Sequence, residues 1–479
     1  MLGRADIMAL TPVILVSATA IVVMLGIAWQ RLHAVTVLVS ALGLNLALLS
    51  LLLVGSLGPT TTPLLVFDGV TLLGMLLVLV SSLACVTFCH AYLEGYPGPR
   101  EEFYLLLLCA AAGGMILTAA NHLATLFFGL ELLSMPIYGM LAYTFRDRLS
   151  LEAGIKYLVL SAAGTSFLLF GMALLYAQTG QLAIDGIVAA MATGNGPWAL
   201  AGVGFVLVGL GFKLSVIPFH LWTPDVYQGG PSPAVTFLAT ASKAAAFIVL
   251  LRVVVAIPAF HGTEAHDLLA GLALLTMLAG NLLALMQANL KRLLGYSSIA
   301  HFGYLLVALV VADGMAVETS GIYLVTYLVT TLAAFGVVTL LSSPYSGEDA
   351  SALHHYRGLF WRRPYLAAVL TVALLSLAGI PFTAGFIGKF YILALGVEAQ
   401  RWWLVGGIVV GSAIGLFYYL RVMVTLYLVE PGMSRRDAPN DWGLRAGGLV
   451  VLGLAGLTIL LGVYPAPVVR WIAQLSLTG

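Results

Sequence analysis

The chain has 479 residues, of which 61% are hydrophobic and only 9% are charged, and its formal net charge is +1. A chain of this length with so few charged residues has too little polar surface to stay soluble in water. The composition therefore excludes a soluble or nucleic-acid-binding protein and indicates a polytopic membrane protein. The three cysteines form no CxxC pair and no metal-ligand spacing with histidine, so we expect no metal site, iron–sulfur cluster or disulfide on this chain.

Fourteen apolar runs in the sequence are long enough to cross about 30 Å of hydrocarbon. The first run lacks a small-residue cleavage site after a basic flank, so it is interpreted as a span rather than a removable signal. We therefore expect an all-α polytopic membrane protein with about 14 transmembrane helices. The predicted spans are residues 8–29, 34–55, 67–90, 103–120, 123–145, 156–178, 198–218, 233–257, 267–288, 296–312, 320–341, 363–397, 402–428 and 444–464.

Positive charge falls mostly on one side of the membrane when the N-terminus is placed outside. Because cytoplasmic loops carry an excess of Lys and Arg, this asymmetry predicts that both termini are periplasmic. Only Arg4, Arg252, Arg401 and Arg470 fall outside. The cytoplasmic side receives Arg31, Arg100, Arg146, Arg148, Lys156, Lys291, Arg292, Arg357, Arg362, Arg363, Arg421, Arg435, Arg436 and Arg445.

Two predicted spans share an unusual interruption. The seventh contains Lys213, Pro218 and His220, and the twelfth contains Pro381 and Lys389; both prolines stand in an Ile-Pro-Phe sequence. Proline removes a backbone donor and clashes with the preceding turn, so both helices are expected to break there. Matched broken helices, whose free backbone groups line a cavity, are a sequence indication of a transport path.

The two broken spans are five apart, so they cross the bilayer in opposite directions. Spans 4–8 and 9–13 are therefore expected to form two inverted five-helix repeats. The predicted units are an N-terminal three-helix segment at 1–102, a first repeat at 103–258, a second, inverted repeat at 266–428 and a C-terminal helix at 444–479. No loop is long enough for a soluble nucleotide or flavin domain.

Glu131, Lys213, Lys243 and Lys389 lie within long apolar stretches of the predicted spans. A charge at the bilayer centre costs roughly 2.5 to 3.5 kcal/mol, so four isolated charges would cost about 10 to 14 kcal/mol. Lysines near helix ends usually snorkel to the interface, but Lys213 and Lys243 lie too deep for that. The four groups are therefore candidates for a proton or cation path.

The histidines are weaker candidates. His220 and His301 are each interpreted either as a proton relay or as a hydrogen-bonded packing residue. His122 stands at a loop edge and ranks lower. Asp225 follows the break in the seventh span, where it is expected to cap the helix that begins there.

Three long motifs carry a resemblance to a known family: FGLEL at 128–132, GFKLSVIPFHLWTPD at 211–225 and KRLLGYSSIAH at 291–301. They resemble the antiporter-like membrane subunits of proton-pumping NADH-quinone oxidoreductase, respiratory complex I, and the resemblance extends from span 4 to span 13. Within this group the chain is similar to subunit N, because it has Lys389 where subunit M typically has glutamate and lacks the lateral helix of subunit L. The segment YRGLFW at 356–361 is also similar to subunit N.

The resemblance implies roles for the four buried ionisable residues. Glu131, Lys213, Lys243 and Lys389 match the family's ionisable residues of spans 5, 7, 8 and 12, which would move protons along a mid-membrane axis. Glu131 and Lys213 would form a switch, within salt-bridge or one-water reach of each other. His220 and His301, with ordered water, would bridge the longer gaps.

The resemblance also implies an assembly. The chain would be one subunit of an H⁺-translocating enzyme of a bacterial inner membrane, surrounded by lipid and by the other membrane-arm subunits. NADH, FMN, iron–sulfur clusters and quinone would all be bound by partner subunits, so this chain would hold no cofactor and perform no redox chemistry.

Two other functions are compatible with some of these features. The same core occurs in Mrp-type Na⁺/H⁺ antiporter subunits, but a sodium site needs several carboxylate or carbonyl ligands, whereas this chain offers one intramembrane carboxylate and three cations. A purely structural membrane scaffold would leave the buried charges unexplained.

Overall fold

The computed structural model describes residues 3–94, 96–192, 194, 196–257, 263–311, 314–342, 349–429 and 446–475. The first half of the chain forms α1 (Arg4–Ala9), α2 (Thr11–Trp29), α3 (His33–Leu57), β1 (Thr60–Thr61), β2 (Val66–Phe67), α4 (Gly69–Leu93), α5 (Glu101–Thr118), α6 (Leu123–Leu141), α7 (Arg148–Thr179), α8 (Ile184–Ala192), α9 (Pro197–Leu214), α10 (Trp222–Gly229), α11 (Ser232–Phe237), the π-helical turn η1 (Leu238–Ser242) and α12 (Lys243–Ala256). The second half forms α13 (Thr263–Leu285), α14 (Leu290–Val311), α15 (Gly314–Leu341), the 3₁₀ turn η3 (Leu353–Tyr356), α16 (Leu359–Arg362), α17 (Pro364–Ala378), α18 (Ala384–Glu398), α19 (Trp402–Tyr427), α20 (Ala446–Val463) and α21 (Ala466–Ala473).

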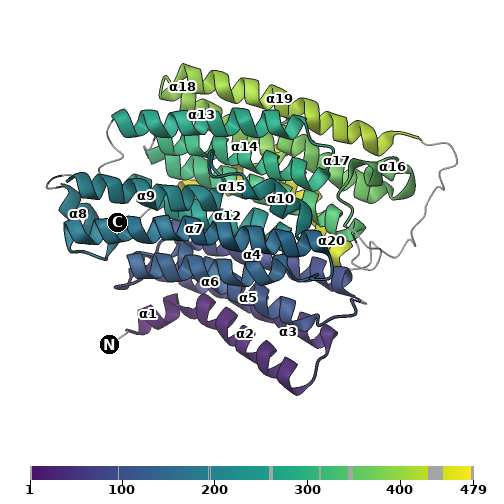
Figure 1. Cartoon of the computed structure of the whole chain (residues 1–479), viewed down its shortest axis with the longest axis horizontal. Coiled ribbons are helices and arrows are strands. Elements are labelled where there is room, and N and C mark those ends of the chain that lie inside the picture. Colours follow the sequence, from purple (N-terminus) through teal and green to yellow (C-terminus); the bar gives the residue numbers. More distant parts are fainter. Residues whose placement is uncertain are drawn as a thin grey trace.

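The long helices lie side by side in one bundle (Figure 1). Within the described residues, 13 helical segments are long and apolar enough to cross a membrane, and Ser232–Ala256 counts as one of them. The shorter helices α17 and α18 follow each other where the twelfth span is predicted. The predicted all-α polytopic membrane fold is thereby confirmed.

Span 6 begins earlier than predicted. The helix α7 starts at Arg148 rather than at residue 156, because Asp147 caps it by accepting a hydrogen bond from the Leu149 backbone N–H. Its first turns are polar and extend the helix beyond its apolar part. Hydropathy therefore located the span but not the start of the helix.

Both predicted helix breaks are present. The helix α9 ends at Leu214, Ser215 adopts φ +64°, and α10 begins only at Trp222. In the second repeat α17 ends at Ala378, and the chain passes through Gly379 at φ +85° before α18 begins. Backbone groups around both breaks lie outside regular helix, as the prolines predicted.

The first and last described helices lie at the same end of the bundle. The helix α1 contacts β1, which pairs with β2 just before α4, and Leu475 lies against Gly69 at the start of α4. We call this the α1 end. The opposite end, the basic end, carries the loops with Arg31, Arg100 and Arg146. Arg435, Arg436 and Arg445 lie outside the described residues, as do the predicted unit boundaries at 258 and 444.

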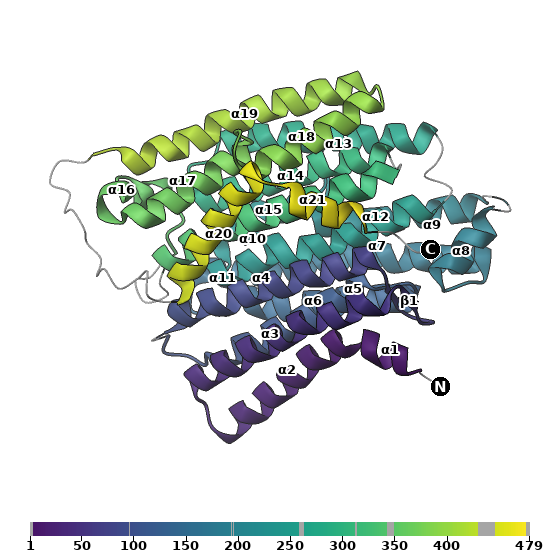
Figure 2. The same cartoon turned by 180° about the vertical axis from the view of Figure 1, so that it is seen from behind.

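The centre of the bundle is the eighth span. The most apolar window of Ser232–Ala256 is 100% buried, whereas that of α2 is only 28% buried. Seen from behind, α20 and α21 cross the bundle over α15 (Figure 2). The eighth span is therefore the most deeply buried of the candidate spans among the described residues.

Candidate functional site

Lys213 is buried at the first helix break. Its side chain is 1% exposed, and Nζ donates hydrogen bonds to Ser134 Oγ on α6 at 2.7 Å and to Tyr157 OH on α7 at 2.6 Å. The ammonium also lies 5.0 Å from the centre of the Tyr157 ring. Hydroxyl oxygens therefore replace the water that a lysine loses on burial.

Glu131 is predicted to lie within salt-bridge or one-water reach of Lys213, and the second of these alternatives stays a prediction. Among the described residues no ion pair joins them; the Glu131 carboxylate, partly exposed on α6, accepts a hydrogen bond from Thr165 Oγ1 at 2.8 Å. Ser134, one turn further along α6, contacts Lys213 instead. Glu131 is still near enough to interact electrostatically with Lys213. Both residues lie in the spans predicted for them, and their contacts depend on how the side chains of α6, α7 and α9 pack.

Lys243 lies at the end of the π-helical turn η1 and has no exposed surface. Its Nζ donates to Ser298 Oγ on α14 at 2.9 Å and lies 5.1 Å from the centre of the Phe302 ring. Ser298 Oγ is hydrogen-bonded to Tyr327 OH on α15 at 2.7 Å, and Tyr327 donates to the Ala239 carbonyl within η1 at 3.2 Å. A π-helical turn directly before a buried lysine is a feature that hydropathy does not predict.

His301 lies beside this group and is 5% exposed. One ring nitrogen is 2.7 Å from Tyr323 OH, and the other is 3.4 Å from Tyr419 OH. His301 also lines a small cavity, about large enough for one water molecule, that reaches Ser376 and Gly385 at the second helix break. Its hydroxyl partners fit both interpretations, a relay and a hydrogen-bonded packing residue, so the relay role stays a prediction.

Lys389 follows the second break, on α18, as predicted. Its Nζ donates to the carbonyl of Ala378, the last residue of α17, at 2.9 Å, and lies 5.3 Å from the centre of the Tyr304 ring. A Cβ at Gly379 would lie 2.7 Å from Lys389 Cδ. The break thus supplies both the acceptor and the space that this lysine needs.

The structure also places the other two histidines and Asp225, and the relay role of His220 stays a prediction. His220, in the first break, has a buried Nδ1 without a partner and makes no hydrogen bond to Lys213 or Lys243 within the described chain. His122 caps α6 by accepting from the Ala124 N–H at 3.1 Å. Asp225 was expected to cap α10, but it lies within this helix and does not cap it.

Asp225 instead bridges three helices. Its carboxylate accepts from Lys156 on α7 at 2.7 Å and from Arg292 on α14 at 2.6 Å.

The hydroxyl partners of the buried lysines were not predicted from the sequence. Ser298 lies in a motif that sequence analysis singled out, but Tyr157 and Tyr327 lie in apolar spans without any local signal.

Comparison with protein families gives one match over most of the core. The family described as "NADH:quinone oxidoreductase/Mrp antiporter, TM" matches residues 120–415. Two relatives are described as NADH-quinone oxidoreductase subunit N. That of Chromohalobacter salexigens is 68% identical over 469 residues, covering 98% of each chain, and that of Ectopseudomonas mendocina is 60% identical over 479 residues, covering 99% of this chain and 97% of the relative.

Solved structures share the same architecture. A chain of respiratory complex I from Thermus thermophilus, solved with bound aureothin, superposes with a TM-score of 0.83 at 36% identity, covering 97% of this chain and 100% of the other. A chain of the Mrp complex from Dietzia sp. superposes with a TM-score of 0.85 at 19% identity, covering 98% of this chain and 96% of the other. At that identity the second similarity concerns the fold alone.

Proposed function

Because the chain belongs to the NADH-quinone oxidoreductase subunit N family, we propose that it is a proton-translocating subunit of the membrane arm of that enzyme. NADH is oxidised and quinone reduced on other subunits, which hold the FMN, the iron–sulfur clusters and the quinone. This chain carries the coupled proton movement in a bacterial inner membrane. Both termini then face the periplasm, and the basic end of the bundle faces the cytoplasm.

The observation that carries this proposal is the series of three buried lysines, each in contact with hydroxyl or carbonyl oxygens near mid-bundle. Lys213 and Lys389 lie at the two helix breaks, and Lys243 lies between the repeats. None of the three forms an ion pair within the described residues. A buried ammonium without a counter-ion is costly, so its proton is easily released to a neighbouring acceptor.

Glu131 controls the first lysine. When its carboxylate moves toward Lys213, the ammonium form is stabilised; when it stays with Thr165, the charge is uncompensated and the proton leaves. Tyr157, which contacts Lys213, also lies beside Ser242, the residue before Lys243. Ordered water next to these hydroxyls completes the path from Lys213 to Lys243.

His301 links the second part of the path. It lies three residues after Ser298, the partner of Lys243, and is near enough to Lys389 to interact with it electrostatically. The small cavity beside His301 extends to the second break, where Lys389 is anchored. Protons therefore pass from Lys243 through His301 and water to Lys389, and leave toward the α1 end.

An Mrp-type antiporter function is less suitable. The described residues contain no group of three or more His, Cys, Asp or Glu side chains arranged to hold a metal ion, and the mid-bundle charges are mostly cationic. A sodium ion would be repelled by three lysines unless several carboxylates offset them.

The test compares Lys213→Arg with Lys213→Ala in the intact complex in sealed inverted vesicles, with NADH-driven ΔpH and Na⁺ uptake both recorded. Arginine keeps the charge but does not release its proton near neutral pH, so both variants should lose most of the ΔpH signal. Normal pumping by the Arg variant would indicate that the charge at this position has only a structural role. A ΔpH that needs Na⁺ but not NADH would indicate an antiporter.

A further inference from the structure

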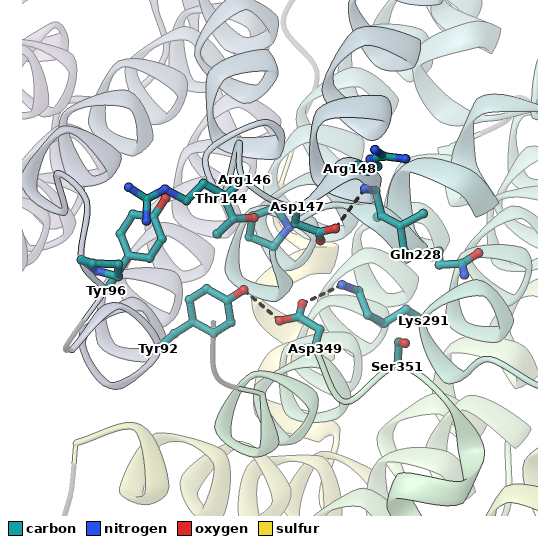
Figure 3. Close-up of a pocket in the computed structure, with 14 residues that line it drawn as sticks. Tyr92, Tyr96, Thr144, Arg146, Asp147, Arg148, Gln228, Lys291, Asp349 and Ser351 are labelled. Carbon is teal, nitrogen blue, oxygen red and sulfur yellow. Dashed lines mark hydrogen bonds and ion pairs between the residues drawn. The ribbon is translucent and has the colours of Figure 1, made fainter. Parts of the chain in front are cut away.

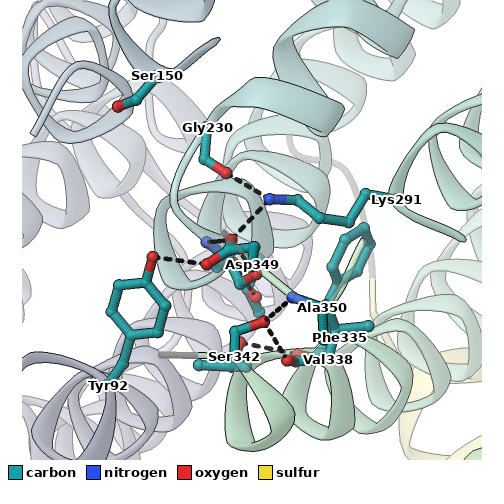
Figure 4. A network of polar contacts seen from close by, with 12 residues as sticks. Tyr92, Ser150, Gly230, Lys291, Phe335, Val338, Ser342, Asp349 and Ala350 are labelled. Atoms are coloured by element: carbon teal, nitrogen blue, oxygen red, sulfur yellow. Dashed lines mark hydrogen bonds and ion pairs between the residues drawn. The ribbon is translucent and has the colours of Figure 1, made fainter. Parts of the chain in front are cut away.

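A buried polar network at the basic end of the bundle is satisfied within the chain. It forms one wall of a cavity of about 700 Å³ (Figure 3). Lys291 Nζ on α14 donates to Asp349 Oδ2 at 2.8 Å and to the Gly230 carbonyl at 2.6 Å (Figure 4). Asp349 also accepts from Tyr92 OH at 2.8 Å and from the hydroxyl of Ser232, the first residue of α11, at 2.6 Å. The pair thus joins α14 to α11 and needs no group from another protein.

Asn45 on α3 is the opposite case. It is the central residue of a helix of 25 residues, and its side chain is exposed on the outside of the bundle. At 1.5 Å per residue it lies about 18 Å from either end of the helix. Its Nδ2 donates to the Ala41 carbonyl, one turn earlier, at 2.8 Å. The other amide hydrogen and Oδ1 have no hydrogen-bond partner among the described residues.

A carboxamide at this depth faces hydrocarbon. Lipid tails offer neither donors nor acceptors, so an unpaired amide hydrogen and an unpaired carbonyl oxygen are both unfavourable there. A carboxamide has two donor hydrogens and an acceptor oxygen, of which α3 itself satisfies one donor. Asn45 therefore indicates a hydrogen-bonding group from outside the described chain.

Asn45 stands in the middle of an outward-facing row of leucines, which we call the α3 stripe. Leu38, Leu42, Asn45, Leu49 and Leu52 follow each other at spacings of four and three residues, which keeps all five on one face of the helix. The four leucine side chains are 54% to 73% exposed. Side chains at this spacing fit between those of a second helix, and a single Asn among them fixes the register of the pair.

The neighbouring helix α2 is a contrasting surface. It has an exposed stripe at the same spacing, so the spacing alone does not indicate a partner. Its exposed side chains in the middle of the span are all apolar: Ile14, Ala18, Ile21, Val22, Met24 and Leu25. Acyl chains are sufficient to cover such a surface. The carboxamide is what distinguishes the α3 stripe from it.

The inner face of α3 holds the helix in place. A Cβ at Gly43 would collide with the Thr19 side chain of α2, so these two helices approach closely. The helix also packs against α4 and α5. Both overall views place α2 and α3 at the edge of the bundle opposite α19 (Figures 1 and 2). The α3 stripe is thus a fixed surface at an edge of the subunit, where an adjacent subunit has access to it.

We propose that the α3 stripe is the docking face for a transmembrane helix of a neighbouring subunit of the membrane arm. The inference rests on the place of this chain in that assembly. The docked helix is apolar where it meets the four leucines and carries one amide or hydroxyl side chain opposite Asn45. In hydrocarbon, this one polar contact sets the register of two otherwise uniform apolar surfaces.

The first test asks what lies against the stripe. A photoreactive benzophenone amino acid replaces Leu42, one turn from Asn45. The matched control carries it in place of Ile21 on α2, because both native side chains are 54% exposed. The intact complex is irradiated in its native membrane, and the crosslinked peptides are identified by mass spectrometry.

The probe at position 42 should crosslink to a transmembrane peptide of another subunit of the same complex, with an amide or hydroxyl side chain in that peptide. The probe at position 21 should give several-fold less of this product. Crosslinks only to lipid, to a second copy of this chain or to a protein outside the complex would overturn the proposal, and so would equal yields at the two positions.

The same vesicles separate this proposal from the proposed function. If NADH-driven ΔpH is normal and the subunit crosslink is absent, the docking face is wrong and the proposed function stands. If wild-type vesicles give the crosslink but no NADH-driven ΔpH, the docking face is supported and the proposed function is contradicted.

The second test concerns the hydrogen bond. Asn45→Leu continues the leucine row and keeps α3 helical, but removes the carboxamide, so the fraction of free chain on native gels at rising detergent concentration should increase several-fold. Asn45→Gln, which keeps a carboxamide, should release less. Ser56→Leu is the control, because that exposed hydroxyl is already bonded to the Leu53 carbonyl within α3. Equal release from wild type and Asn45→Leu would refute the contact, and equal release from Asn45→Leu and Ser56→Leu would show that it is not specific to Asn45.

Discussion

Lys243 of the first repeat donates a hydrogen bond of 2.9 Å to Ser298 of the second repeat. Ser298 is in turn bonded to Tyr327, which reaches back to the Ala239 carbonyl in the π-helical turn before Lys243. The central lysine and the turn that carries it are therefore both tied to the other repeat. A change of charge at Lys243 changes the contact that joins the two halves of the molecule.

This contact leads to the first prediction. Ser298→Ala should leave the buried Lys243 ammonium without its acceptor, at a cost of about 1–3 kcal/mol, and slow proton pumping. Tyr327→Phe should act through the same contact, so the double variant should be less impaired than the sum of the two. The rate of NADH-driven ΔpH in inverted vesicles measures this. Ser50→Ala, which removes a buried serine bonded only within α3, should be without effect.

Glu131 gives the second prediction. Because Lys213 is bonded to Ser134 and Tyr157, Glu131→Ala should leave its position intact and keep the subunit in the complex. Pumping and, through coupling, NADH-quinone turnover should fall, because the carboxylate no longer stabilises the charged lysine. Thr165→Val, which removes only the hydrogen bond to Glu131, should have a smaller effect. Full pumping by Glu131→Ala would exclude a switch at this residue.

The Lys291–Asp349 pair gives the third prediction, on stability and pH. The pKa of Asp349 lies below 3.8 in the fold, so its stabilisation is complete above the pKa of the unfolded chain and is lost as pH falls through the folded value. Asp349→Asn should cost about 3–5 kcal/mol near neutral pH, because it leaves Lys291 buried without its counter-ion. Thermal dissociation of the detergent-extracted complex, followed as a function of pH, should show this loss and a weaker acid dependence below pH 4.

A double variant is the control for that prediction. Asp349→Asn combined with Lys291→Met removes both charges and should recover part of the lost stability. If Asp349→Asn alone melts like the wild type at neutral pH, the pair does not hold α11 and α14 together.

Gly379 gives the fourth prediction. Gly379→Ala places a Cβ only 2.7 Å from Lys389 Cδ and strains a backbone at φ +85°, so Lys389 should move away from the Ala378 carbonyl and pumping should fall. Gly406→Ala, on α19 with open space around its Cβ position, should be neutral. Comparing ΔpH rates of these two variants checks the claim; equal rates would mean that the break tolerates a side chain.

Much of the fold could be predicted from local chemistry. The number of spans follows from the length of apolar runs, and the two breaks follow from Pro218 and Pro381, because both depend on residues within one helix. The start of α7 was misplaced, since a capped polar turn extends a helix beyond its apolar part. The site could be predicted as far as its buried ionisable residues, because a charged residue inside an apolar run is visible in the sequence whatever its partners are.

The sequence by itself determined that four charged groups lie within membrane spans and that two spans break beside lysines. Only the tertiary structure decided what those groups contact. Lys213 meets Tyr157 from 56 positions away, Lys243 meets Ser298 from 55, and Lys291 pairs with Asp349 from 58. Such partners depend on how each helix is rotated and packed against helices from other parts of the chain. A single hydroxyl in an apolar helix adds almost nothing to the patterns that set span, direction or break, so its role becomes visible only when the helices are assembled.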